Sequence, residues 1–262
     1  MSGKRKISIQ ERRHQDYLRL RGTRVAAVYQ RRLMKDRRAE LRRVLDLCRD
    51  AGDVDAVASI LEGNLTETGY LGSWWEGLWI DTGLPMAKST ARDLRVAKAA
   101  GEGAEDFWLA SLKTYARQRA GNTIVIVTGT WKDTLLKLLR QIMIEEVTIS
   151  VEKLTDRLYR DYLASLEKWQ CRRIAQTEAL IGMADAAAVA ANTLDVGFTK
   201  QWCISGLGNT RASHEIEDGV EVDQNEPFSL PGGLLMYPHD VSLGADADEI
   251  INCACACIRR PK

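Results

Sequence analysis

Long hydrophobic runs are missing from this sequence. No apolar stretch approaches the ~18 residues that a membrane-spanning helix requires, so no membrane span is expected. The basic first residues are not followed by an apolar stretch either, which excludes the pattern of a secretory signal. We therefore expect a protein that is made in the cytoplasm, has no membrane partner and keeps its cysteines reduced.

The short motifs of the common enzyme classes are missing as well. The sequence contains no P-loop, no nucleophile elbow and no H-E-x-x-H pattern. His214 does have acidic neighbours, among them Glu217 and Asp218, and acid–base chemistry uses such groups. Acidic residues beside an Asp-Gly turn, however, are usually part of a solvated loop. The sequence therefore predicts a protein that is not an enzyme, with a metal-dependent nuclease or toxin as the weakest alternative.

Net charge is nearly absent, at +1, but the two ends of the chain differ strongly in charge. Residues 1–49 contain 16 lysines and arginines against 5 acidic residues, whereas residues 200–262 contain 5 basic and 10 acidic residues. Such an asymmetry gives a protein two kinds of surface. We expect the two ends of the chain to meet different partners.

The basic end is predicted to form one long helix over residues 8–50, or two helices joined end to end. Its apolar residues recur at the spacing of one helix face, as in Leu41, Val44, Leu45 and Cys48. We expect this helix to be removable without unfolding the rest of the chain.

Arginines fill the other faces of this predicted helix. Because arginine pairs bidentately with phosphate and carboxylate, they would suit either nucleic acid or an acidic protein surface. A helix bundle with internal salt bridges is the alternative, although the helix has too few acidic residues to neutralise every arginine. The candidate binding residues are Arg12, Arg13, Arg19, Arg24, Arg31, Arg32, Arg37, Arg38, Arg42 and Arg43.

Further helices are predicted for the middle of the chain. The glycine- and tryptophan-rich segment 63–85 is expected to be a packed loop or an irregular helix contact rather than a ligand platform. Residues 123–127 are β-branched and strand-like, after a break at Gly121-Asn122, but they need not form a strand, because a helix is predicted to begin at Thr130. Helical periodicity and caps predict helices at about 54–62 and 104–119, from Thr130 through Ile142, from Ser150, and at about 168–193.

The composition changes after Asn192. Turn residues become frequent, the helical period disappears, and residues 198–204 alternate like a strand. We expect His214 on a strand of a hairpin whose turn is Asp218-Gly219. The sequence thus predicts an α+β protein with a mainly helical N-terminal region of long helices and a small, Cys/His-containing module that is β-rich or α+β. The predicted divisions are a basic helix (1–50), a helical region (51–195) and the C-terminal module (196–262).

Cysteines are concentrated in this module. Cys253, Cys255 and Cys257 alternate with alanine, which in a strand places all three thiols on one face. Two such thiolates, with a histidine and a cysteine from neighbouring segments, could complete a tetrahedral structural zinc site. Small buried core residues are the alternative, because the paired C-x2-C elements of zinc ribbons are missing. His239, in a proline-marked loop, is expected to face solvent. The candidate metal ligands are Cys203, His214, Cys253 and Cys255.

Several short elements follow one another in a fixed order towards the C-terminus. They are Arg172-Arg173-Ile174-Ala175-Gln176-Thr177-Glu178, Trp202-Cys203-Ile204-Ser205, Asn209-Thr210-Arg211-Ala212-Ser213-His214, Glu217-Asp218-Gly219, Tyr237-Pro238 and Asn252-Cys253-Ala254-Cys255. Together they resemble the signature of the Mu F-like phage head-morphogenesis proteins. The resemblance spans roughly residues 120–258 and rests on order and spacing, because each element alone is short. Gln176 and Ala254 stand where the family usually has arginine, and any contact made by the arginine beside the cysteines is not carried over to Ala254.

This resemblance implies a phage minor head protein, a structural protein of virion assembly. It implies the portal protein or the major capsid protein as partner, contact with packaged DNA, and a place in the virion or procapsid interior after assembly in the host cytoplasm. A stand-alone nucleic-acid-binding protein with a zinc-stabilised module is the alternative from a different class.

Overall fold

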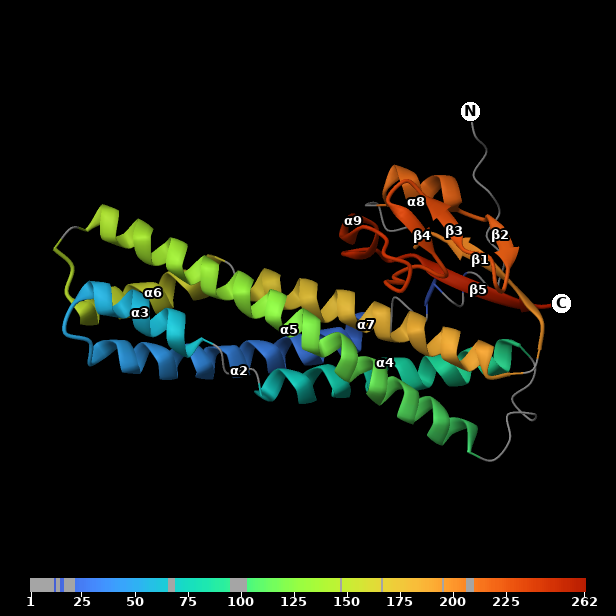
Figure 1. Cartoon of the computed structure of the whole chain (residues 1–262), viewed down its shortest axis with the longest axis horizontal. Coiled ribbons are helices and arrows are strands. Elements are labelled where there is room, and N and C mark those ends of the chain that lie inside the picture. The colour runs from blue at the N-terminus through green and yellow to red at the C-terminus, as the bar shows by residue number, and fades with distance from the viewer. Residues whose placement is uncertain are drawn as a thin grey trace. The chain divides into compact units, whose positions relative to one another are not determined.

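The computed structural model describes residues 12, 15–16, 22–65, 69–94, 103–146, 148–165, 167–194, 196–205 and 210–262. Long helices precede a module of short strands and helices (Figure 1), which confirms the predicted mainly helical α+β fold. The helices are α2 (Thr23–Arg49), α3 (Val54–Asn64), α4 (Gly69–Asp93), α5 (Ala104–Glu145), α6 (Val151–Ser165), α7 (Glu167–Asn192), α8 (Ala212–Glu217) and α9 (Ala247–Ile250). The strands are β1 (Phe198–Cys203), β2 (Glu221–Asp223), β3 (Phe228–Leu230), β4 (Gly233–Leu235) and β5 (Ala256–Pro261).

Local signals in the sequence account for several helix starts. The side chain of Asp53 accepts a hydrogen bond from the backbone N–H of Ala56 at 2.8 Å, which caps α3. Ser150 precedes α6, where its hydroxyl accepts from the N–H of Lys153 at 3.4 Å. The helices predicted at 54–62, from Ser150 and at 168–193 are therefore confirmed within a few residues.

Two segments that were predicted to be irregular or extended are helical. The tryptophan-rich segment lies mostly in α4, and residues 123–127 lie in the middle of α5 without a break at Gly121. A loop for the first segment and a strand for the second are not observed, because β-branched and glycine residues disfavour a helix only weakly, whereas burial of a helix face can override them. The helix-contact alternative for the first segment agrees with the burial of Trp74, Trp75 and Trp79 in α4. Val125 and Ile126 are exposed, and the helix around them is anchored by buried residues before and after, such as Ala120 and Trp131.

Contacts divide the chain into two compact units. The first consists of Met1–Ala27, Glu76–Ala116 and Ala175–Lys262, and the second of Val28–Trp75 and Arg117–Ile174. Helices α2, α4, α5 and α7 contribute residues to both units. The boundaries of the two compact units therefore do not coincide with the change in composition after Asn192.

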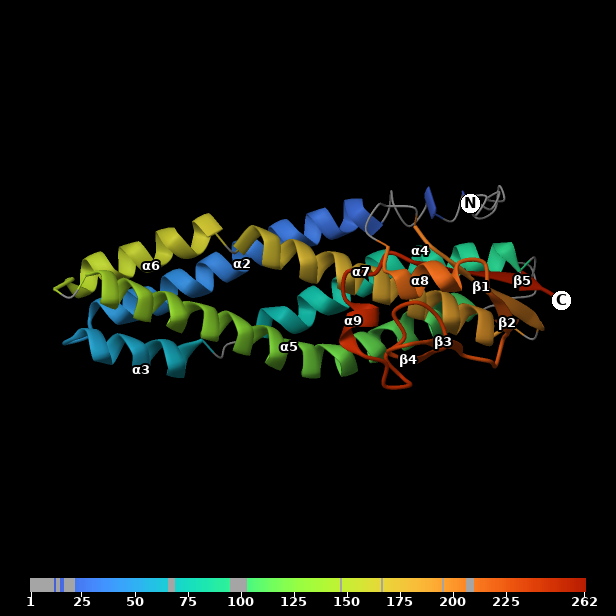
Figure 2. The same cartoon turned by 90° about the horizontal axis from the view of Figure 1, so that it is seen from above.

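The second unit is built around one apolar core shared by α2, α3, α5 and α6, which lie side by side in Figure 2. Leu41 of α2, Leu61 of α3 and Leu158 of α6 are fully buried in it. Because α2 supplies part of this core, the expectation that the basic helix can be removed without unfolding the rest is wrong.

The sheet of the first unit has the strand order β2-β1-β5, and all its pairs are antiparallel. The predicted strand at 198–204 is confirmed as β1, which pairs Lys200 with Arg259 and Trp202 with Cys257. Asp218-Gly219 does form a turn, with φ 87° at Gly219, but the predicted hairpin is wrong because the segment before the turn is helix α8. Strand β2 pairs with β1 instead.

Helix α7 is long and apolar enough to cross a membrane by length and composition alone, but 67% of that apolar window is buried inside the protein. Its small residues allow close packing within the first unit. Gly83 of α4 packs against Gly182 of α7 and Leu112 of α5. A Cβ atom at Gly83 would lie 3.0 Å from the carbonyl oxygen of Gly182 and 2.9 Å from a methyl carbon of Leu112. The apolar composition of α7 is thus accounted for by its burial.

Candidate metal centre

Helix α8 and the segment before β5 bring the candidate ligands together. His214 lies on α8, and the guanidinium group of Arg211, at the start of that helix, donates to the carbonyl oxygen of Ile251. Asn252 follows in a left-handed conformation, with φ 58°, and its N–H donates to the hydroxyl of Thr177 on α7. These contacts fix the backbone immediately before Cys253.

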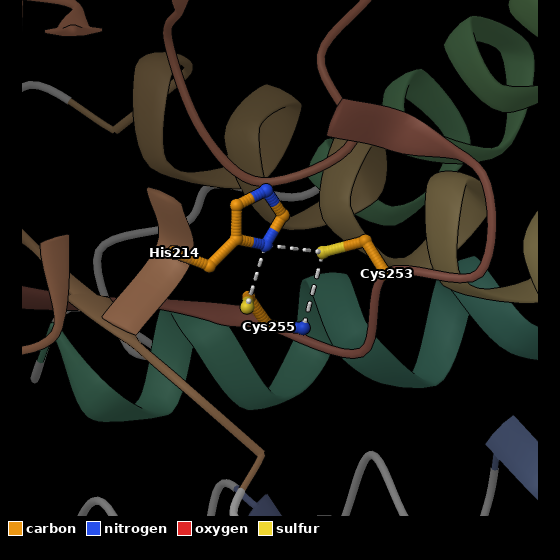
Figure 3. A group of neighbouring side chains, drawn as sticks. All are labelled: His214, Cys253 and Cys255. Atoms are coloured by element: carbon orange, nitrogen blue, oxygen red, sulfur yellow. Dashed lines mark hydrogen bonds between the residues drawn. The ribbon is translucent and has the colours of Figure 1, made fainter. Parts of the chain in front are cut away.

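One imidazole nitrogen of His214 faces two thiols (Figure 3). Its Nδ1 lies 3.6 Å from Sγ of Cys253 and 3.3 Å from Sγ of Cys255, and all three ligand atoms lie within 4.8 Å of one another. With zinc bond lengths and a tetrahedral angle, a nitrogen and a sulfur ligand of one ion lie about 3.6 Å apart. The three buried residues therefore form a group that could bind a metal ion.

The other imidazole nitrogen of His214 is held by Glu249. The Nε2 atom lies 2.7 Å from Oε2 of Glu249, which also accepts from the hydroxyl of Ser213 at 3.2 Å. The other carboxylate oxygen accepts from the N–H of Gly232, where a Cβ atom would lie 2.6 Å from Cγ of Glu249. A carboxylate that accepts a hydrogen bond from Nε2–H keeps the proton on Nε2, so the lone pair of Nδ1 is free to face a metal.

Protonation in this group is uneven. A hydrogen bond from Cys255, aided by His214 and by the charge of nearby His239, holds the pKa of Cys253 well below its usual range. The same pairing with Cys253, together with burial, raises the pKa of Cys255. Burial opposes protonation of His214, but Cys253 and Glu249 raise its pKa overall. The backbone N–H of Cys255 also donates to Sγ of Cys253 at 3.3 Å, so one thiolate, the metal-binding form, is already favoured.

Cys203, the fourth ligand predicted from the sequence, does not belong to this group. It is buried with Ala256 and Ile258, and its Sγ accepts from the side-chain amide of Gln15. Alternation along β1 explains the difference, because Trp202 faces the His214 side of the sheet and Cys203 faces the other side. Cys253, Cys255 and Cys257 pack in one apolar cluster with Trp202, although only Cys257 lies in a strand, because β5 begins at Ala256.

His239 was predicted to face solvent, and that prediction was wrong. Its side chain is 1% exposed, because the loop after β4 packs against small residues of α7 such as Ala184 and Ala187. Neither ring nitrogen makes a hydrogen bond of ordinary geometry with the described residues. Its backbone φ of 73° is one that a side chain with a Cβ rarely adopts. No local pattern in the sequence indicated this burial, nor the role of Glu249.

The predicted arginine surface is partly retained on the described part of the chain. Arg13 and Arg19 lie outside the described residues. Arg37 is buried, with Nη1 2.7 Å from Glu40 and its guanidinium stacked on Trp131 at 4.2 Å, so it is corrected from a surface residue to a core residue of the second unit. Arg38 is half-buried, and the exposed arginines of the predicted set are Arg12, Arg24, Arg31, Arg32, Arg42 and Arg43.

Elements that are far apart in the sequence thus meet around His214. Trp202 packs edge-on against its ring at 5.3 Å, Arg211 and Asn252 fix the segment that carries the two thiols, and Thr177 anchors that segment to α7. Comparisons with protein-family models, with curated proteins and with solved structures each gave no match.

Proposed function

We propose that His214, Cys253 and Cys255 hold a structural zinc ion that stabilises the C-terminal module. The observation that carries this proposal is the pair of Nδ1–Sγ distances, 3.3 and 3.6 Å, in a site where Glu249 fixes the opposite nitrogen. The ligands are buried, which suits a closed structural site rather than one that admits substrate. Binding free energy at such a site becomes folding free energy of the small module around it.

His239 is our candidate for the fourth ligand in place of Cys203. It is buried, it lies close enough to Cys253 to interact with it, and its ring nitrogens lack ordinary hydrogen bonds with the described residues. An imidazole left without partners in the interior is costly, and a metal ion would supply the missing partner.

Metal analysis of the purified chain tests both statements. We expect about one zinc ion per chain in the wild type, little zinc in Cys253→Ser, and weakened retention in His239→Ala. Cys48→Ala, in the core of the second unit, serves as the control and should keep its zinc. A wild-type protein purified without metal, and unable to take up zinc after reduction, would refute the site. Full zinc retention by His239→Ala would refute only the fourth ligand.

For the whole chain we propose the role of a phage minor head protein that acts in head morphogenesis and is not an enzyme. The support is the ordered Mu F-like signature from Arg172 to Cys255, of which Thr177, Arg211, His214, Cys253 and Cys255 contribute to the candidate metal centre. Its proposed partner is the portal protein or the major capsid protein, within the procapsid or virion. The exposed arginines of α2 are the proposed contact with packaged DNA or an acidic protein surface.

Co-expression with portal and capsid proteins encoded by genes next to that of the chain distinguishes this role from its alternative. A minor head protein should co-sediment with procapsids or portal rings after a high-salt wash. Binding to DNA without retention on either assembly would favour the stand-alone nucleic-acid-binding protein instead. Hydrolysis of nucleic acid that His214→Ala abolishes would favour a metal-dependent nuclease.

A further inference from the structure

A cleft of about 490 Å³ lies within the first unit, separate from the candidate metal centre. The first turns of α5, the last turns of α7, strands β1 and β5 and the loop after β4 surround it. Its volume is in the range of sites that bind a small molecule or a few side chains of a partner.

Two buried cations line this cleft from adjacent strands. Lys200 and Arg259 are direct cross-strand partners, and they are only 2% and 5% exposed. Like charges placed opposite each other destabilise a sheet, and the cost grows when water is excluded. Burial lowers the pKa of Lys200, and the charge of Arg259 adds to that effect.

Neither Lys200 nor Arg259 forms an ion pair with a residue in the described part of the chain, although the charges of Asp240 and Asp223 act on Lys200 from a greater distance. Lys200 donates to the carbonyl oxygen of Met236 at 3.0 Å, which is a neutral acceptor. Arg259 lies over the ring of Tyr237 at 5.9 Å and makes no hydrogen bond or ion pair with a described residue. Burying a guanidinium group without an ion pair costs free energy of desolvation, and a bound anion would offset that cost.

The carboxylates of the cleft wall are already engaged by neutral donors. Asp240 accepts from the backbone N–H groups of Met236 at 2.9 Å and Ser242 at 2.8 Å. Asp185 accepts from the hydroxyl of Tyr237 at 3.0 Å. These two acidic groups would repel a chain of phosphates more strongly than a single anion.

The rim of the cleft is apolar and exposed. Phe107 and Tyr115 on α5 and Val241 in the loop after β4 are 53%, 44% and 45% exposed. Exposed aromatic residues around a recessed charge are typical of a surface that meets another protein.

We infer that this cleft binds a single carboxylate of an extended protein segment, flanked by apolar side chains that cover the rim. Arg259 would hold the carboxylate with two parallel hydrogen bonds and Lys200 would add a second charge. The flanking side chains would pack on Phe107, Tyr115 and Val241. The partner is thus an acidic, partly apolar peptide segment, which a nucleic acid cannot replace because its charges recur at every nucleotide.

The probe is the capped peptide acetyl-Leu-Phe-Glu-Leu-amide, titrated into the full-length chain and followed by NMR of the arginine side chains. We expect it to bind at least about tenfold more tightly than its glutamine counterpart, because only the acid form makes charge-assisted hydrogen bonds. Arg259→Gln should abolish this preference. Arg260→Gln, which alters the next residue on the opposite face of β5, is the matched control and should retain it.

Arg259→Lys guards against a folding defect, since it keeps the charge but loses the bidentate geometry, and it should lower the preference several-fold. Equal binding of the two peptides, no binding at millimolar concentration, or an undiminished preference in folded Arg259→Gln or Arg259→Lys would each overturn the inference. Binding of a single-stranded oligonucleotide at this cleft in place of the peptide would overturn it in favour of a nucleic-acid site.

Discussion

Glu249 shows how a single buried residue can define a site without being a ligand. Its two oxygens accept from His214, Ser213 and Gly232, so it fixes both the tautomer and the orientation of the imidazole. Such partners of ligating histidines strengthen the ligand and hold it in place.

We expect Glu249→Gln to weaken zinc binding by about 10–100-fold, since a neutral amide replaces the charged acceptor. Competition with a zinc-sensitive dye would measure the change. Glu215→Gln, which alters an exposed carboxylate on α8 next to His214, should leave the affinity unchanged. Equal affinities in the wild type and Glu249→Gln would remove Glu249 from the site.

Lys200 shows the opposite case, a charged residue whose burial lowers stability. Lys200→Met should raise the free energy of unfolding by about 1 kcal/mol at pH 7, because it removes a buried charge opposite Arg259. Its pKa is lowered in the folded state, so the unfolded chain binds more protons below its ordinary value of 10.5. The free-energy penalty of burying Lys200 in the wild type therefore becomes smaller as the pH rises towards 10.5.

The gain from Lys200→Met should accordingly shrink between neutral pH and about pH 10. Urea unfolding of both proteins at several pH values measures this difference, in which the titrating groups that do not interact with Lys200 cancel. A variant that is less stable than the wild type at pH 7, or a gain that does not depend on pH, would contradict the prediction.

At the scale of elements, α2 combines a core face with a charged face. Its buried leucines belong to the second unit, and Arg37 is drawn into the same core, whereas Arg24, Arg31 and Arg32 are exposed. The periodicity of the helix could be read from the sequence. Which arginine points inwards could not, because Arg37 is buried through its contacts with Glu40 and Trp131, and Trp131 lies far away in the chain.

Replacing Arg24, Arg31 and Arg32 together by glutamine should weaken DNA retention at low salt and reduce its salt dependence. The plot of log K against log salt has a negative slope, and each lost phosphate contact makes that slope shallower by about 0.9. The corresponding triple lysine variant keeps the charge and should retain DNA, as a filter-binding titration would reveal. Unchanged retention by the glutamine variant would exclude this face as the DNA contact.

At the scale of the whole molecule, the two compact units should respond differently to metal removal. Chelation should destabilise the first unit by about 3 kcal/mol if zinc is present at about 100 times its dissociation constant. Hydrogen exchange should then rise around residues 198–258, while residues 41–61 keep their protection. Leu61→Ala should do the reverse, at a cost of about 2–5 kcal/mol in the second unit and with no loss of zinc. Equal loss of protection in both units after chelation would contradict a local role of the metal.

The sequence by itself determined the class of fold, most helices, strand β1 and the two thiols of the metal centre, Cys253 and Cys255. Periods of 3.6 and 2 are local properties, so they placed α3, α6, α7 and β1. Cys253 and Cys255 lie before β5 rather than in a strand, although their side chains pack in one cluster. Tertiary structure decided the rest. It excluded Cys203, because the pairing of β1 with β5 turns that thiol away from His214. It also buried His239 and Glu249 beside the site and Arg37 in a core, because side chains from distant segments surround them, and such contacts leave no periodic trace along the chain.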